Sequence, residues 1–208
     1  MLHKGLYDES IRSYEAFLGA YKGQNYLKDS YYKMGICYWL MDKENAAKTE
    51  FTIAKGIGKE TTEADRYAAK ALLEDQPPPP ALVKLRYFTD GGYYSQAMEL
   101  TRTMNSNSFT HKKEQVEFVY RQARLFHKMG DLPKAKTIYN DAIDLSANSE
   151  WYFAPNACLQ LGYIALEEGR EREAKEMFQK ALSYRKHEYK NSIDSKARSA
   201  LAQLKDRR

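Results

Sequence analysis

One pattern of small and large residues recurs along the chain, and it constrains the fold more than any other sequence feature. Its clearest copy covers residues 154–186 and contains Gly162, Gly169, Ala174 and Phe178. Small residues at Gly162 and Ala174 let two helices approach closely, and Phe178 fills the space between them. Gly169 ends the first helix, because glycine readily adopts the left-handed conformation found at helix C-termini. The copy therefore predicts two antiparallel helices joined by a short turn.

Three further copies and a half copy align with this one. The pattern positions are occupied by Ala123, Phe126, Gly130, Ala135, Tyr139 and Ala142 in one copy, by Met34, Gly35, Tyr38, Ala47, Phe51 and Ala54 in another, and by Leu85, Phe88, Gly92 and Ala97 in a weaker one. The opening segment matches only the second half of a copy, with Gly5 at the turn and Tyr14 behind it. The alternative, an unrelated helical bundle with chance periodicity, requires all these copies to be in register by accident.

The order and spacing of these residues resembles the tetratricopeptide repeat (TPR). The resemblance implies an all-α fold, a right-handed superhelical solenoid of antiparallel helix pairs. We expect a single array over residues 1–208. Its parts are a half-repeat at 5–22, repeats at 28–60, 81–106, 113–147 and 154–186, an extra helix and proline linker at 61–80, and a capping helix at 191–206.

The interval between Ala47 and Ala97 is longer than the others and contains the extra segment. Thr61 or Thr62 can cap its helix, and the prolines from Pro77 to Pro80 form a stiff, extended spacer. We interpret the segment as a kink within one array. A proline-rich ligand motif is the alternative.

Several segments resemble the C-terminal region of long, uncharacterised bacterial TPR proteins. They are residues 17–35, 90–97, 151–169 and 187–201. This resemblance brings no activity or catalytic motif with it. It leaves the compartment open: the cytoplasm if the chain is complete, and an exported or periplasmic location if the chain is part of a longer protein.

Motifs that carry chemistry are missing from the sequence. The four histidines His3, His111, His127 and His187 are scattered, without metal-ligand spacing, and no phosphate-binding loop or nucleophile elbow is present. No run of 18 or more apolar residues suggests a transmembrane helix. We therefore expect no enzymatic activity, no cofactor and no metal.

A binding groove is the better-supported site. In a TPR array the first helices of successive repeats line a concave surface, and aromatic and arginine side chains are frequent anchors of interfaces. The candidate groove residues are Tyr32, Trp39, Arg86, Tyr120, Arg124, His127 and Tyr163. The alternative is that half of them pack between helices, which is common for tyrosine in a chain that has 17.

The resemblance also excludes one kind of groove. Co-chaperone TPR domains hold a carboxylate with a lysine and an asparagine one helical turn apart. The matching positions here are Tyr32 and Ile36, or Tyr120 and Arg124, so that clamp is absent.

The sequence thus predicts a protein–protein interaction scaffold that binds a partner segment in the groove. One alternative is a homodimer through the N-terminal half-repeat, where Ile11, Tyr14, Phe17 and Leu18 lack a partner helix. Another is glycan or nucleic-acid binding through the aromatic groove and the basic tail after Arg185. Nucleic acid is not the expected partner, because stacking aromatics are not interleaved with the basic residues.

Overall fold

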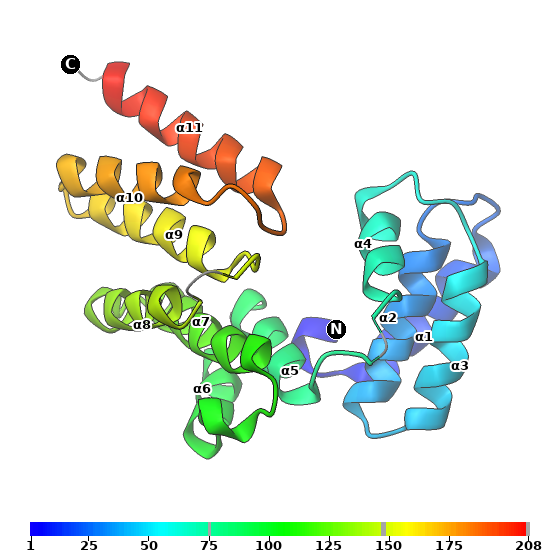
Figure 1. Cartoon of the computed structure of the whole chain (residues 1–208). Helices are drawn as coiled ribbons and strands as arrows, with labels where there is room; N and C mark the ends of the chain where they lie inside the picture. Colours follow the sequence, from blue (N-terminus) through cyan, green and yellow to red (C-terminus); the bar gives the residue numbers. More distant parts are fainter. Residues whose placement is uncertain (75, 147–148, 207–208) are drawn as a thin grey trace. The chain divides into compact units, whose positions relative to one another are not determined.

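The computed structural model describes residues 1–74, 76–146 and 149–206, and most of these residues are helical. They form eleven α-helices and two short 3-10 helices, and the described part contains no strand. The prediction of an all-α fold built from helix pairs is confirmed (Figure 1). The chain divides into two compact units, residues 1–97 and 98–208, which are described separately below.

Unit 1 is built around one helix pair. Its helices are η1 (Leu2–Lys4), α1 (Tyr7–Ala20), α2 (Leu27–Leu40), α3 (Glu44–Gly56), α4 (Glu63–Ala71) and α5 (Pro80–Asp90). Helices α2 and α3 pack against each other most extensively, α1 and α4 both pack on α2, and η1 packs on α5. Helix α6 (Tyr94–Thr103) crosses the boundary between the units.

Unit 2 is a regular stack of helix pairs. It contains η2 (Ser106–Ser108), α7 (Lys112–Lys128), α8 (Leu132–Leu145), α9 (Phe153–Glu167), α10 (Glu171–Ser183) and α11 (Lys190–Asp206). From α7 onward each helix packs on the next, and α9 also contacts both α7 and α11. Helices α7, α9 and α11 therefore form one layer of the unit.

The turns of unit 2 follow from the sequence. Gly130 and Gly169 have φ angles of 83° and 73°, in the left-handed region that side chains with a Cβ rarely adopt. The following residues close the turns, because the backbone N–H groups of Asp131 and Arg170 donate back into the preceding helices. Pro133 lies in the first turn of α8, where its missing N–H leaves no partner unsatisfied.

Close approach within the helix pairs depends on two glycines. A Cβ on Gly162 of α9 would lie 2.5 Å from Cε1 of Phe178 in α10. The same geometry recurs in unit 1, where a Cβ on Gly35 of α2 would lie 2.4 Å from Cε1 of Phe51 in α3. Each phenylalanine ring thus occupies the space that a side chain would need. Both pairs come from the same pattern positions of the repeat.

A buried carboxylate holds the extra helix of unit 1 in place. Asp65 of α4 is fully buried, and its two carboxylate oxygens accept the backbone N–H groups of Tyr26 (2.7 Å) and Asp29 (3.1 Å) at the start of α2. Tyr26 is the N-cap of α2 and provides no side-chain cap itself. Asp65 therefore caps α2 from another helix. The predicted cap of α4 is confirmed as Thr62, whose hydroxyl oxygen accepts the N–H of Asp65.

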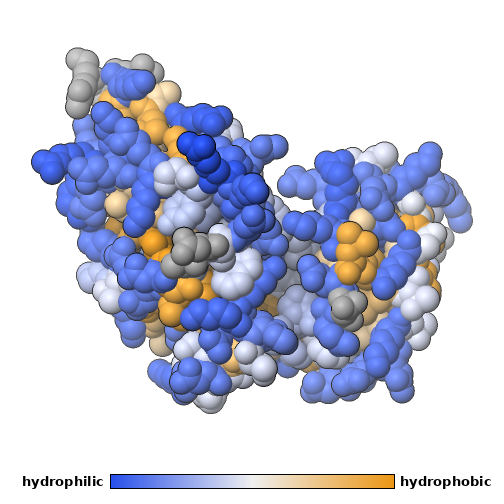
Figure 2. All heavy atoms as spheres, in the orientation of Figure 1, coloured by the Kyte–Doolittle hydropathy of each residue, from blue (hydrophilic) through white to orange (hydrophobic). Residues whose placement is uncertain are grey.

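The expected array of one continuous domain stays a prediction, because the chain divides into two compact units. The unit boundary lies between Ala97 and Met98 rather than at the proline run. Pro79 has the extended conformation expected of a spacer, and Pro80 is already the first residue of α5. Figure 2 shows that one face of the molecule is mainly hydrophilic, with apolar side chains in small patches.

The glycine contacts predict opposite effects for the same substitution at two sites. Alanine favours a helix over glycine by about 1 kcal/mol, but at Gly162 its Cβ would overlap Phe178, so we expect Gly162→Ala to destabilise by about 1–3 kcal/mol. At Gly19 of α1 nothing lies within 4 Å, and Gly19→Ala should stabilise. Urea unfolding followed by circular dichroism measures both changes. Stabilisation by both substitutions would contradict the close contact between Gly162 and Phe178.

The Asp65 cap predicts that unit 1 loses stability at low pH. Burial alone would raise the pKa of Asp65, but hydrogen bonds from the Thr62 hydroxyl and from the two backbone N–H groups outweigh it and lower that pKa. Its stabilising contribution is therefore complete above the unfolded-state pKa of about 3.9 and is lost as the pH falls through the lower folded-state pKa. We expect Asp65→Asn to cost about 1–3 kcal/mol at pH 7, and this cost should shrink below about pH 4.

Trp39 and Trp151 are the two tryptophans of the chain, one in each unit. Fluorescence of Trp39 in a Trp151→Phe background therefore reports the unfolding of unit 1. Asp8→Asn is the control, because it also removes a carboxylate of unit 1. Asp8 is largely exposed, and its ion pair with the exposed Lys43, at 3.9 Å, should contribute little to stability. A cost of Asp65→Asn that does not change with pH would show that the charge of the cap is unimportant.

Candidate functional site

The candidate site is a groove on the layer of unit 2 that α7 and α9 form. Arg124 of α7 donates from Nη1 to Oε1 of Gln160 in α9, at 2.9 Å. Gln160 in turn donates from Nε2 to Oδ1 of Asn156, at 3.2 Å. This chain of hydrogen bonds connects the two helices and fixes the orientation of both amides. Polar groups that are already oriented lose little entropy when a ligand binds.

The groove beside these residues has a volume of about 580 Å³. Its lining consists of Arg124, His127, Lys128, Gly130, Leu132, Gln160, Tyr163, Leu166 and Glu167. Tyr163 and two leucines provide an apolar surface, and Tyr163 itself rests edge-on against Phe178, with ring centroids 5.3 Å apart. Two cations and one acid provide the charge. The groove thus combines an aromatic floor with a rim of hydrogen-bond donors.

His127 is held at the rim by a core tyrosine. Its Nδ1 lies 3.2 Å from the hydroxyl of Tyr139, which is fully buried in α8. Burial lowers the pKa of His127, and the neighbouring positive charge of Arg124 lowers it further. The imidazole is therefore neutral at pH 7, and it can both donate and accept a hydrogen bond.

A second polar cluster on α7 was not predicted from the sequence. Arg121 donates from Nε and Nη2 to the same oxygen of Glu117, at 3.0 and 2.8 Å, and from Nη2 to the hydroxyl of Tyr152, at 2.9 Å. Tyr152 lies edge-on to Tyr189, at 5.2 Å between ring centroids. The four-residue spacing of Glu117 and Arg121 was the available signal, because such pairs meet on one face of a helix.

Comparison with protein families identifies this region. The tetratricopeptide repeat model matches residues 116–149 and 155–188, which overlap the repeats predicted at 113–147 and 154–186. The chain contains two tetratricopeptide repeats within residues 116–188. No protein of curated function matches it significantly. The resemblance to long bacterial proteins stays a prediction.

Tetratricopeptide repeats generally mediate protein–protein interaction, and the proteins that contain them are typically scaffolds without catalytic activity. The described residues contain no group of three or more side chains that could hold a metal ion. Among the same residues, no helix has the length and apolarity needed to cross a bilayer.

Three of the seven predicted groove residues are brought together. Arg124, His127 and Tyr163 line the groove of unit 2, each on the first helix of a tetratricopeptide repeat. Trp39 and Arg86 belong to unit 1, where Trp39 lines a separate cavity. The Trp39 indole donates to the carbonyl of Pro78 (2.9 Å), and Arg86 donates to the Tyr67 hydroxyl (3.1 Å).

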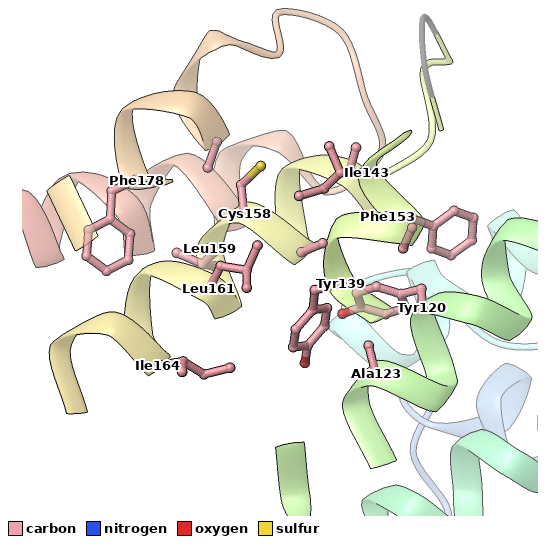
Figure 3. Packing of buried hydrophobic residues seen from close by; sticks show 14 of the residues in the cluster. Tyr120, Ala123, Tyr139, Ile143, Phe153, Cys158, Leu159, Leu161, Ile164 and Phe178 are labelled. Atoms are coloured by element: carbon pink, nitrogen blue, oxygen red, sulfur yellow. The ribbon is translucent and has the colours of Figure 1, made fainter. Parts of the chain in front are cut away.

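The other two predicted groove residues lie in the core. Tyr120 is 3% exposed, between Tyr139 and Phe153, as Figure 3 shows. Tyr32 is 6% exposed and packs on Phe51 and Tyr67. Both side chains point between helices because their positions on α7 and α2 face the neighbouring helix. The burial of Tyr120 does not favour its assignment to a binding surface, whereas Tyr32 also lines a cavity of unit 1.

The N-terminal half-repeat is more covered than its sequence suggested. Ile11 is 5% exposed, and Tyr14, Phe17 and Leu18 are only partly exposed. Helix α1 packs on α2, which supplies the partner that the sequence left missing. Homodimerisation through this helix stays a prediction.

The core position of Tyr120 predicts a large effect on stability. Truncation of a fully buried aromatic side chain typically costs about 3–5 kcal/mol, so Tyr120→Ala should destabilise unit 2 by that amount. Tyr163→Ala removes a partly exposed ring and should cost clearly less. Urea unfolding followed by Trp151 fluorescence in a Trp39→Phe background measures both. If both substitutions lowered the free energy of unfolding by the same small amount, Tyr120 would have to be assigned to the groove rather than to the core.

Proposed function

We propose that the groove of unit 2 binds an extended segment of a partner protein. The observation that carries the proposal is the hydrogen-bonded series Arg124, Gln160 and Asn156, which runs across the layer beside the exposed part of Tyr163. Amide side chains both donate and accept, so they can pair with the backbone of an extended peptide regardless of its sequence. The aromatic ring offers an apolar surface for one of its side chains.

The charges of the groove favour an acidic partner. Arg124 and Lys128 line it together with one acid, Glu167. An arginine held in place by a neighbouring amide can pair with a carboxylate in a defined geometry. We therefore expect an acidic residue of the partner to lie near Arg124. Because the co-chaperone type of clamp is absent, the partner need not end in a free carboxylate.

Selection of peptides on the immobilised chain tests this proposal. A display library of random peptides is enriched on the wild type, and the selected peptides are then measured by fluorescence anisotropy against variants. We expect enrichment of acidic peptides and a loss of affinity of about tenfold or more in the Arg124→Ala/Tyr163→Ala variant. Their affinity should also fall as salt is added.

Arg172→Ala is the matched control. Arg172 lies on α10, its side chain is 94% exposed, and it pairs only with the exposed Glu176 among the described residues. This variant should bind the selected peptides as tightly as the wild type. Equal binding by the Arg124→Ala/Tyr163→Ala variant, with its fold confirmed by circular dichroism, would contradict the proposal.

A further inference from the structure

His127 and Arg124 converge on one hydroxyl group at the wall of the unit 2 groove. His127 Nδ1 lies 3.2 Å from the Tyr139 hydroxyl, and the two rings meet edge-on. The same hydroxyl also interacts with the Arg124 guanidinium. Arg124 and His127 are three residues apart on α7, a spacing that places two side chains on one face of a helix. Both line the groove, so a carboxylate bound at this point can reach both side chains.

The second ring nitrogen of His127 is available to a ligand. Nε2 forms no hydrogen bond with any residue that the structure describes, and the side chain is partly exposed in the groove. The Tyr139 hydroxyl keeps its proton at neutral pH, because burial raises its pKa above the ordinary value. In the imidazolium both nitrogens carry a proton. An Nε2–H donor is then present, whichever nitrogen holds the proton of the neutral ring.

The groups around His127 disfavour the imidazolium in the free chain. Burial lowers the pKa of His127 most, and Arg124 and Lys128 of α7 lower it further. Glu167 of α9 raises that pKa but does not offset the other groups. Tyr139, which faces the ring from α8, is uncharged. The groove thus carries two cations and one acid around a neutral imidazole, and a carboxylate from a partner would shift this balance toward protonation.

We infer that an acidic residue of the partner binds between Arg124 and His127, and that His127 takes up one proton as it binds. This subsite rests on the function proposed above for the groove. It adds the position of the acidic residue and a dependence of binding on pH. The imidazolium then pairs with the carboxylate beside it, and this attraction outweighs the additional burial that the partner causes.

Proton uptake makes binding tighter as the pH falls. In the free chain the pKa of His127 lies below its ordinary value of 6.5, and a neighbouring carboxylate raises it in the complex. The affinity therefore increases as the pH falls through the pKa of the complex, and it levels off below the pKa of the free chain. The carboxylate of the partner stays largely ionised over this range, because such groups titrate near about pH 4.

Two matched peptides test the proton uptake. The first probe is the most enriched acidic peptide from the selection described above, labelled with rhodamine, and the second is the same peptide with every carboxylate replaced by its amide. Fluorescence anisotropy at constant ionic strength gives both affinities between about pH 5 and about pH 8. We expect the wild type to bind the acidic peptide about fivefold more tightly, or better, at the lower pH. The amide peptide should show no such gain.

Two histidines of the same helix region provide the matched variants. His127→Gln keeps a hydrogen-bonding side chain that does not titrate, so the affinity for the acidic peptide should no longer rise as the pH falls. His111→Gln is the control, because His111 is exposed and lies at the other end of α7, as its N-cap residue. This variant should keep the pH dependence of the wild type.

Proton uptake by His127 is contradicted if the wild type binds the acidic peptide equally well at every pH, if a folded His127→Gln variant keeps the full dependence, or if the amide peptide shows the same gain. If His127→Gln does not fold, NMR titration of the His127 Cε1–H signal in the wild type decides. A midpoint that the acidic peptide raises supports the subsite, and one that it lowers or leaves unchanged contradicts it.

The Arg124→Ala/Tyr163→Ala variant separates this failure from failure of the proposed function. If that variant loses the acidic peptide while binding to the wild type does not depend on pH, the groove remains the binding site and only proton uptake is rejected. If the variant binds as tightly as the wild type, or if the selection yields no acidic peptide, both are rejected.

Discussion

The contact between a small residue and an aromatic ring is the constraint that the helix pairs α2–α3, α7–α8 and α9–α10 share. Gly162 meets Phe178 and Gly35 meets Phe51, and in each case a methyl group would collide with the ring. In the α7–α8 pair the same positions hold Ala123 and Tyr139, both fully buried. This spacing lets each helix pair present its first helix to the next pair. Helices α7 and α9 consequently lie close enough for Arg124 to reach Gln160.

Much of the fold could be predicted from the sequence because the repeat carries its own geometry. Gly169 at a turn, Pro133 in a first turn and Thr62 at an N-cap each act through local backbone chemistry, and the structure has all three as expected. The capping of α2 by Asp65 could not be predicted in this way. It joins residues 39 apart in sequence, and no local pattern indicates such a contact.

The site was harder to predict than the fold. Tyr120 and Arg124 are one helical turn apart on α7, yet the tyrosine is in the core and the arginine is in the groove. Periodicity places both on a similar side of the helix, but the packing of α7 against α8 and α9 decides which one is covered. Arg121 was missed for the same reason. It belongs to a polar cluster because it donates to the hydroxyl of Tyr152, the N-cap residue of α9.

The two units show different consequences of one architecture. In unit 2 regular stacking aligns polar side chains along a layer, which suits an extended segment. In unit 1 the short α4 and the prolines interrupt the stacking, and an aromatic cavity is left beside α3. A regular stack would have covered that face with a full helix.

Hydrogen exchange of the whole chain, with and without a bound acidic peptide selected on it, tests the central claim most directly. The account predicts slower exchange in the C-terminal halves of α7 and α9, where Arg124, Gln160 and Tyr163 lie, and unchanged exchange in α8 and α10. Protection confined to α8 and α10, or no protection in unit 2, would show that the partner binds elsewhere than in the groove.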